Sequence, residues 1–167
     1  MPATATTHPL LDGPTAPPPT LHGVLEVLAW DHDRLDALDK AAFEALGRGD
    51  LVAARALFAH FARGLDRHIR FEEEFLFPAI EERAGLPPHA GPTAVMRAEH
   101  VEIRACLASI AASLAADGAG AAQVHARMLD VLGGHNLKEE RILYPMADRA
   151  LGPADAETLV SELQKLG

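Results

Sequence analysis

Residues 68–78 of this 167-residue chain read HIRFEEEFLFP, and residues 135–145 read HNLKEERILYP. When the two stretches are aligned without a gap, a histidine, two consecutive glutamates, a leucine, an aromatic residue and a proline coincide. In each copy the first glutamate follows the histidine by four residues, so both side chains would lie on one face of a helix. The repeat therefore predicts two equivalent helices that each present an imidazole and a carboxylate.

The sequence around these stretches is typical of an all-α protein. Apolar residues recur at spacings of three and four, and clusters of glycine or proline interrupt the pattern only about every 35 residues. We predict four long helices, over residues 21–46, 50–83, 93–116 and 121–150, and a short fifth helix from Gly152-Pro153 to Leu166. Long helices joined by short loops pack as an antiparallel up-down-up-down four-helix bundle.

The composition separates a predicted tail from a predicted domain. Residues 1–20 hold six of the twelve prolines, among threonine and alanine, so we expect a flexible tail there and one domain over residues 21–167. A hydrophobic content of 49% is enough for a substantial core. No apolar run is long enough to span a membrane and no basic leader with an apolar segment is visible, so we expect a cytoplasmic protein.

Charge and cysteine content exclude several classes of function. A formal net charge of −9 with only 15 lysines and arginines argues against binding to nucleic acid or to an anionic membrane. The single cysteine, Cys106, excludes an intrachain disulfide or a thiolate metal cage. Any metal would therefore be held by histidines and carboxylates.

Four histidines are predicted to lie at one depth of the bundle. Residues on neighbouring antiparallel helices face each other when the loop lies midway between them in the sequence. The midpoint of His32 and His68 is residue 50, and that of His68 and His100 is residue 84. The midpoint of His100 and His135 falls between residues 117 and 118, so each midpoint lies at or beside a predicted break. With the two glutamates of the repeat, the inward-facing set is His32, His68, Glu72, His100, His135 and Glu139.

This set of nitrogen and oxygen ligands predicts a transition-metal site. Imidazole-rich sites without sulfur suit iron above all, rather than Ca²⁺ or Mg²⁺, although Zn²⁺ or Mn²⁺ would accept the same groups. If each glutamate bridges two metals and each metal takes two histidines, every metal has four protein ligands, and an oxo or hydroxo bridge adds a fifth. Octahedral iron would keep one position open for O₂, peroxide or nitric oxide.

Over about residues 22–150 the chain resembles the hemerythrin-like, or HHE cation-binding, domains. The resemblance rests on the two H-x-x-x-E-E-x-x-L-(F/Y)-P stretches, and it implies a bundle around a non-haem di-iron centre with the same six residues as ligands. Oxygen-carrying hemerythrins have a fifth histidine where this chain has Arg104, and an aspartate where it has Glu140. The ligand set looks more like that of di-iron proteins of iron-sulfur cluster repair and nitrosative stress, which usually carry an additional N-terminal segment with a cysteine.

Three functions stay open at this point, and with them whether the protein is an enzyme. We favour binding or sensing of O₂, peroxide or nitric oxide; the alternatives are a redox enzyme or iron donor in cluster repair, and a structural or stored metal. The oligomeric state and protein partners are not predicted.

Several other residues are expected to lie outside the site. His22 and Glu26 are interpreted as a chance pair, and His125 as a residue of the surface or the core edge. Glu73 and Glu140 would lie about 140° around the helix from their histidines and are expected to pair outward. The aromatic residues at position 10 of the two stretches, Phe77 and Tyr144, are expected to be core packing.

Overall fold

The computed structural model describes residues 8–88 and 90–165, with side chains through Leu163. Helices and no strands occur in these ranges, which confirms the all-α prediction. The long helices are α1 (Val24–Gly47), α2 (Leu51–Phe71), α4 (Pro92–Ala115) and α5 (Ala121–Lys138). Two π-helical segments, η2 (Glu72–Leu76) and η3 (Glu139–Leu143), continue α2 and α5 into α3 (Phe77–Ala84) and α6 (Tyr144–Lys165), and a 3₁₀ turn, η1 (Pro9–Leu11), lies near the N-terminus.

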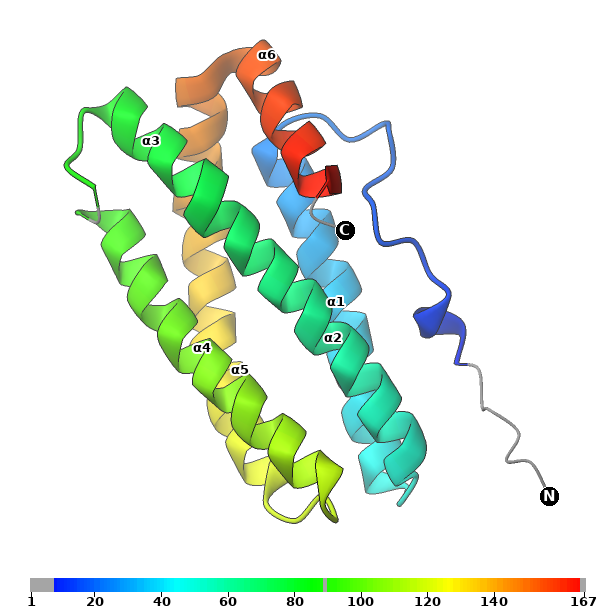
Figure 1. Ribbon diagram of the computed structural model, residues 1–167. Coiled ribbons are helices and arrows are strands. Elements are labelled where there is room, and N and C mark those ends of the chain that lie inside the picture. The colour runs from blue at the N-terminus through cyan, green and yellow to red at the C-terminus, as the bar shows by residue number, and fades with distance from the viewer. Residues whose placement is uncertain (1–7, 89, 166–167) are drawn as a thin grey trace.

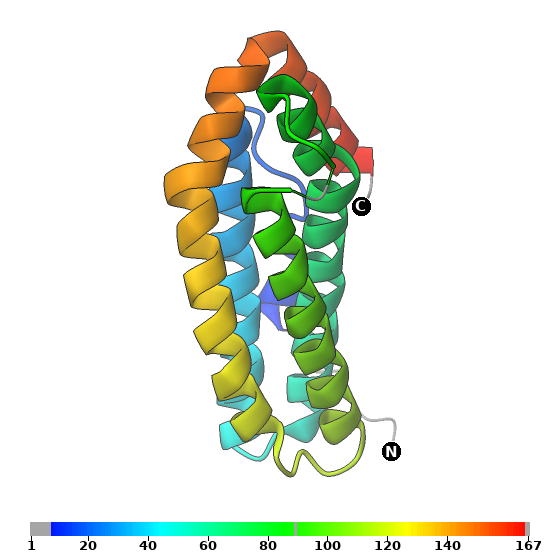
Figure 2. The same cartoon turned by 90° about the vertical axis from the view of Figure 1, so that its left-hand side faces the viewer.

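The helices lie side by side along one long axis (Figures 1 and 2). α1 packs against α2 and α6, and α4 packs against α5 and α2. At Gly152 the backbone leaves the helical conformation, with φ of 71° and ψ of 168°, and the last part of α6 folds back across the end of the bundle. This break is the predicted start of the fifth helix; its predicted end at Leu166 lies outside the described residues.

The interior consists of two apolar clusters with a polar layer between them. On α1, for example, Leu28 belongs to one cluster and Leu35 to the other, and buried His32 lies between them. The cluster near the α1–α2 and α4–α5 loops also contains Phe58, Phe61, Ile103 and Met128, and the cluster near α3 and α6 contains Phe71, Phe77, Met96 and Leu151. Apolar packing on both sides therefore positions the polar layer.

Part of the segment predicted to be a tail packs on the bundle. Leu10 and Leu11 contact the apolar cluster that contains Leu35, and Pro17 is buried. The Arg67 guanidinium donates to the carbonyl oxygen of Thr15 at 2.7 Å. Residues 1–7 lie outside the described range, and the flexibility of residues 1–20 stays a prediction. Within the described ranges, no helix has both the length and the apolar character needed to cross a membrane.

Candidate metal centre

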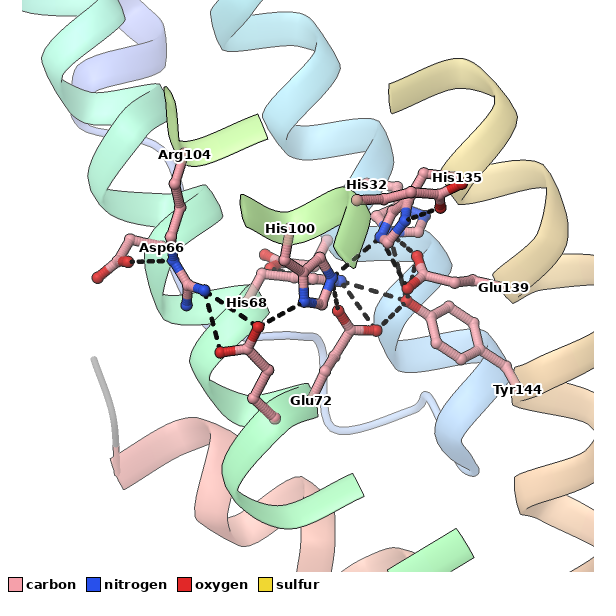
Figure 3. A network of polar contacts seen from close by, with 12 residues as sticks. His32, Asp66, His68, Glu72, His100, Arg104, His135, Glu139 and Tyr144 are labelled. Atoms are coloured by element: carbon pink, nitrogen blue, oxygen red, sulfur yellow. Dashed lines mark hydrogen bonds and ion pairs between the residues drawn. The ribbon is translucent and has the colours of Figure 1, made fainter. Parts of the chain in front are cut away.

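All six residues of the predicted inward-facing set lie together in the polar layer (Figure 3). Each has a relative exposure of 5% or less. Their potential ligand atoms form two groups in which every atom lies within 4.8 Å of the others: one contains Glu72, His100, His135 and Glu139, and the other contains His32, His68 and Glu139. We call these the His100–His135 half and the His32–His68 half.

Each of the two buried glutamates faces both halves with a different oxygen. Glu72 Oε2 lies 3.3 Å from His100 Nε2, and Glu72 Oε1 lies 3.8 Å from His68 Nε2. Likewise Glu139 Oε1 lies 2.9 Å from His135 Nε2, and Glu139 Oε2 lies 3.5 Å from His32 Nε2. This arrangement allows each carboxylate to bridge two ions.

The glutamates project from the two π-helical segments. Glu72 and Glu139 are the first residues of η2 and η3, and their carbonyl oxygens accept hydrogen bonds from the N–H groups five residues later, those of Phe77 and Tyr144. Such widened turns are rare in helices and occur mostly at functional sites. Because the proline that follows each segment cannot donate a backbone hydrogen bond, the α-helical pattern is already interrupted at this point. The π-helical form of these turns was not predicted from the sequence.

A second carboxylate binds the far nitrogen of each histidine. Hydrogen bonds at Nδ1 join His68 to Asp31 at 3.0 Å, His100 to Glu73 at 2.8 Å, His135 to Glu99 at 2.9 Å and His32 to Glu140 at 2.8 Å. A carboxylate at Nδ1 selects the tautomer in which Nδ1 carries the hydrogen and Nε2 presents a lone pair to the interior of the cluster. The four rings are therefore oriented for coordination through Nε2.

These four contacts form a closed ring around the bundle. The acid that binds the histidine of α2 comes from α1, and the acid that binds the histidine of α4 comes from η2. The acid that binds the histidine of α5 comes from α4, and the acid that binds the histidine of α1 comes from η3. Sequence reasoning missed Asp31 and Glu99, although each directly precedes a predicted ligand. Glu73 does pair outward, with Arg104, as expected; its additional bond to His100, and that of Glu140 to His32, were not predicted.

Cations hold three of the four outer carboxylates. Asp31 is paired with Arg34 and Arg67, Glu99 with Lys138, and Glu73 with Arg104 at 3.0 Å. Arg104 occupies the position of the fifth histidine of oxygen-carrying hemerythrins. Its guanidinium also lies 3.6 Å from Asp66 and is one-third exposed, so this side chain supports the outer ring and does not enter the cluster (Figure 3).

Burial and the acidic neighbours shift the pKa values of the cluster in opposite directions. Burial alone would lower the pKa of His32 and His135, but Glu139 in particular outweighs it and raises them to about 9 and about 8. Burial would raise the pKa of Glu139, yet the two histidines hold it well below the usual value. In the same way, His68, Arg34 and Arg67 overcome burial and lower the pKa of Asp31 to about 2.

The cluster has the unsatisfied atoms that a cation would complete. Among the described residues, Glu72 Oε2 and Glu139 Oε1 are buried and accept no hydrogen bond when the neighbouring imidazoles are neutral at Nε2. His100 Nε2 and His135 Nε2 lie 3.1 Å apart, and with Nδ1 of each ring bound to a carboxylate their lone pairs face each other when the rings are neutral. Unpartnered buried polar atoms are costly, and a positive ion between them removes that cost. The residues present fit a metal.

Of the residues expected to lie outside the site, the His22–Glu26 pair and His125 do so, whereas Tyr144 reaches into the cluster. The Glu26 carboxylate accepts the backbone N–H of His22 at 2.9 Å at the start of α1, so this pair is a local capping contact. His125 stacks on Phe43 and binds Asp39 at 2.6 Å, which places it at the core edge. Tyr144 packs in the core as expected, but its hydroxyl group also reaches into the cluster, 2.7 Å from Glu72 Oε1.

Comparison with known proteins supports the same interpretation. No curated protein and no solved structure matches the chain. The family model of the hemerythrin HHE cation-binding domain matches residues 23–147. This match covers most of the chain, including both repeated stretches and all six clustered residues, and so confirms the resemblance seen in the sequence: the protein belongs to the hemerythrin HHE cation-binding domain family.

Proposed function

We propose that the protein binds two iron ions and that its function is to bind, or react with, O₂, peroxide or nitric oxide. The observation that carries the proposal is the division of each buried glutamate between two pairs of histidines. Four imidazoles and two carboxylates would overcrowd a single ion, whereas two ions receive four protein ligands each. The proposed ligands are His32, His68, Glu72, His100, His135 and Glu139.

The proposal includes an antiparallel up-down-up-down order of the four long helices. The short connections between α1 and α2 and between α4 and α5 support this order, as does the meeting of one histidine from each long helix in a single layer. The order matters for function because it brings the two repeated stretches to the same depth, and with them Glu72 and Glu139.

The protein's own residues would prepare the site for a small ligand. The outer carboxylates orient the imidazoles, and the two apolar clusters exclude bulk water from the layer between them. Iron, when bound there, would supply redox chemistry and an open coordination position. Because the six side chains are almost fully buried, the centre suits a diatomic molecule or peroxide better than a large substrate.

Metal analysis tests the binuclear arrangement. Protein reconstituted anaerobically with iron and freed of excess metal should contain about two ions per chain, and His22→Ala should contain the same amount because its ring is outside the cluster. Saturation at one ion per chain would refute the binuclear proposal. The same titration with Zn²⁺ and Mn²⁺ compares the metals that accept this ligand set.

Absorption spectra separate the three functional classes. The iron-loaded protein is measured before and after exposure to air, peroxide and nitric oxide. A persistent, reversible change with O₂ or nitric oxide supports binding or sensing, and rapid consumption of added peroxide supports a redox enzyme. No spectral change with any of the three would contradict the proposal and leave a structural or stored metal.

A further inference from the structure

The hydroxyl group of Tyr144 lies among four of the proposed ligand atoms. Tyr144 Oη is 2.7 Å from Glu72 Oε1 and 3.0 Å from Glu139 Oε2. It is also 3.2 Å from His68 Nε2 and 3.4 Å from His32 Nε2. Three of these atoms belong to the His32–His68 half, and the fourth is the Glu72 oxygen that faces it; the tyrosine is fully buried (Figure 3).

These neighbours are more than one hydroxyl group can satisfy. A phenol has a single hydrogen to donate, and both carboxylates can only accept it. In the neutral state that metal binding requires, the two imidazoles donate from Nδ1 to Asp31 and Glu140, so their Nε2 atoms are acceptors as well. Four acceptors then surround one O–H group in a buried site, and an ion bound by all five atoms removes the conflict.

The distances also match those between ligands of one metal. With metal–ligand bonds of about 2.0 to 2.2 Å, ligands at a right angle to each other lie about 3 Å apart. The Tyr144 oxygen lies between 2.7 and 3.4 Å from each of its four neighbours. We propose that Tyr144 is a fifth protein ligand, through its phenolic oxygen, of the metal in the His32–His68 half. This inference rests on the proposed binding of two metal ions.

The equivalent residue in the other repeat cannot do the same. Phe77 occupies the position of Tyr144, and its ring stacks on His100 with 5.7 Å between centroids and 10° between planes. The His100–His135 half thus has four protein ligands and the His32–His68 half has five. If an oxo or hydroxo group also bridged the two ions, the Tyr144-bound ion would have six ligands and the other would have five. An incoming small ligand would therefore bind in the His100–His135 half.

The chain offers a direct test, because Tyr144 is its only tyrosine. On binding, the phenol loses its proton to solvent, as metal ligands generally do. A phenolate bound to iron(III) absorbs visible light by charge transfer, and Raman scattering excited in that band shows the ring vibrations of the tyrosine. Wild-type protein shown to hold two iron(III) ions per chain should have both signals. Their absence at full iron loading would overturn the inference and leave the proposed metal binding intact.

Two variants provide matched controls. Tyr144→Phe, measured at equal iron content, should lose the visible band and the ring vibrations, whereas Phe77→Tyr retains Tyr144 and should keep both. Persistence of the band in Tyr144→Phe would refute ligation. If Tyr144→Phe does not fold, the inference is tested by titrating the wild-type protein with Zn²⁺. The near-ultraviolet difference spectrum of tyrosinate should appear and saturate as metal is added. Its absence would refute the inference. Iron content below two ions would instead count against the binuclear proposal itself.

Discussion

The outer ring of carboxylates allows metal affinity and fold stability to be perturbed separately. Asp31 and Glu140 have the same role toward a proposed ligand, since each accepts the Nδ1–H of a histidine, that of His68 and that of His32. Their surroundings differ. Asp31 is fully buried, whereas the side chain of Glu140 is 40% exposed. Asp31→Asn and Glu140→Gln therefore make a matched pair of nearly isosteric changes.

The expected loss of stability is much larger for Asp31→Asn. Asp31 also accepts from Arg34 Nε at 2.8 Å and from Arg67 Nη2 at 3.1 Å. Removing its charge leaves both guanidinium groups without their buried counter-ion, and breaking a buried ion pair in this way costs about 3 to 5 kcal/mol. The half-exposed contact of Glu140 is of the kind worth about 0 to 1 kcal/mol.

Metal affinity should fall in both variants. An outer carboxylate orients its imidazole and increases the basicity of the coordinating nitrogen, and its loss typically reduces metal affinity about 10- to 100-fold. We expect a reduction in this range for Glu140→Gln, with near wild-type stability. For Asp31→Asn we expect a similar reduction together with the large loss of stability.

Two measurements check these expectations. Urea unfolding of the metal-free proteins, followed by circular dichroism, gives the free energies of unfolding, and competition with a chelator gives the affinity for Zn²⁺ or iron. Equal stability losses in the two variants would refute the assigned role of the Arg34 and Arg67 contacts. Unchanged metal affinity in Glu140→Gln would refute the role of the outer ring in orienting the ligands.

Three further predictions follow from the cluster. His32→Ala should strongly impair metal binding and His22→Ala should not, which metal analysis measures; equal effects would contradict the assignment of one histidine per long helix. Glu72→Ala and Glu139→Ala should each reduce, by similar amounts, the gain in melting temperature that metal gives through binding the native state; if only one variant loses this gain, the two repeated stretches are not equivalent. Finally, the pKa of His32 is raised from 6.5 to about 9 and that of His135 from 6.5 to about 8. The stability that the two protonated histidines give the metal-free protein is therefore fully present below pH 6.5 and is lost as the pH rises through 8 to 9. Metal requires neutral imidazoles, so the difference in melting temperature between iron-loaded and metal-free protein should widen from pH 6.5 to pH 9; a constant difference would contradict these pKa shifts.

The inner cluster could be predicted because it depends on few physical quantities. A spacing of four residues puts a histidine and a glutamate on one helix face, whatever the rest of the fold. The rise per residue and the position of the loops then determine which histidines meet. His32 and His100 were found in this way although they lie outside the repeated stretches. The positions of glycine and proline located the loops accurately enough, because an error of one or two residues at a helix end does not move a histidine out of the layer.

The outer ring could not be predicted by the same reasoning. Glu73 lies far around the helix from His68, and on an isolated helix that direction is simply away from the interior. In the bundle it faces a neighbouring helix, where His100 is within hydrogen-bonding distance. The handedness of the bundle determines which helix lies on each side of a given helix. The spacing of residues within one helix gives no information about this handedness. The acidic residues directly before His32 and His100 were a visible signal whose partners could not be assigned for this reason.

The two halves of the chain are equivalent in what they supply to the cluster, with one chemical exception. α1 and α4 each supply a histidine preceded by an acid, and α2 and α5, with their π-helical continuations, each supply a histidine, a buried glutamate and an outer glutamate. Neither half alone closes the site, because the ring of outer carboxylates passes from one half to the other through Glu73 and Glu140. Phe77 and Tyr144 occupy equivalent positions next to this shared framework, and only Tyr144 carries an oxygen. If two ions bind and Tyr144 is a ligand of one of them, as proposed, a single hydroxyl group is sufficient to make two otherwise equivalent metal positions differ in the number of coordination sites left for an incoming molecule.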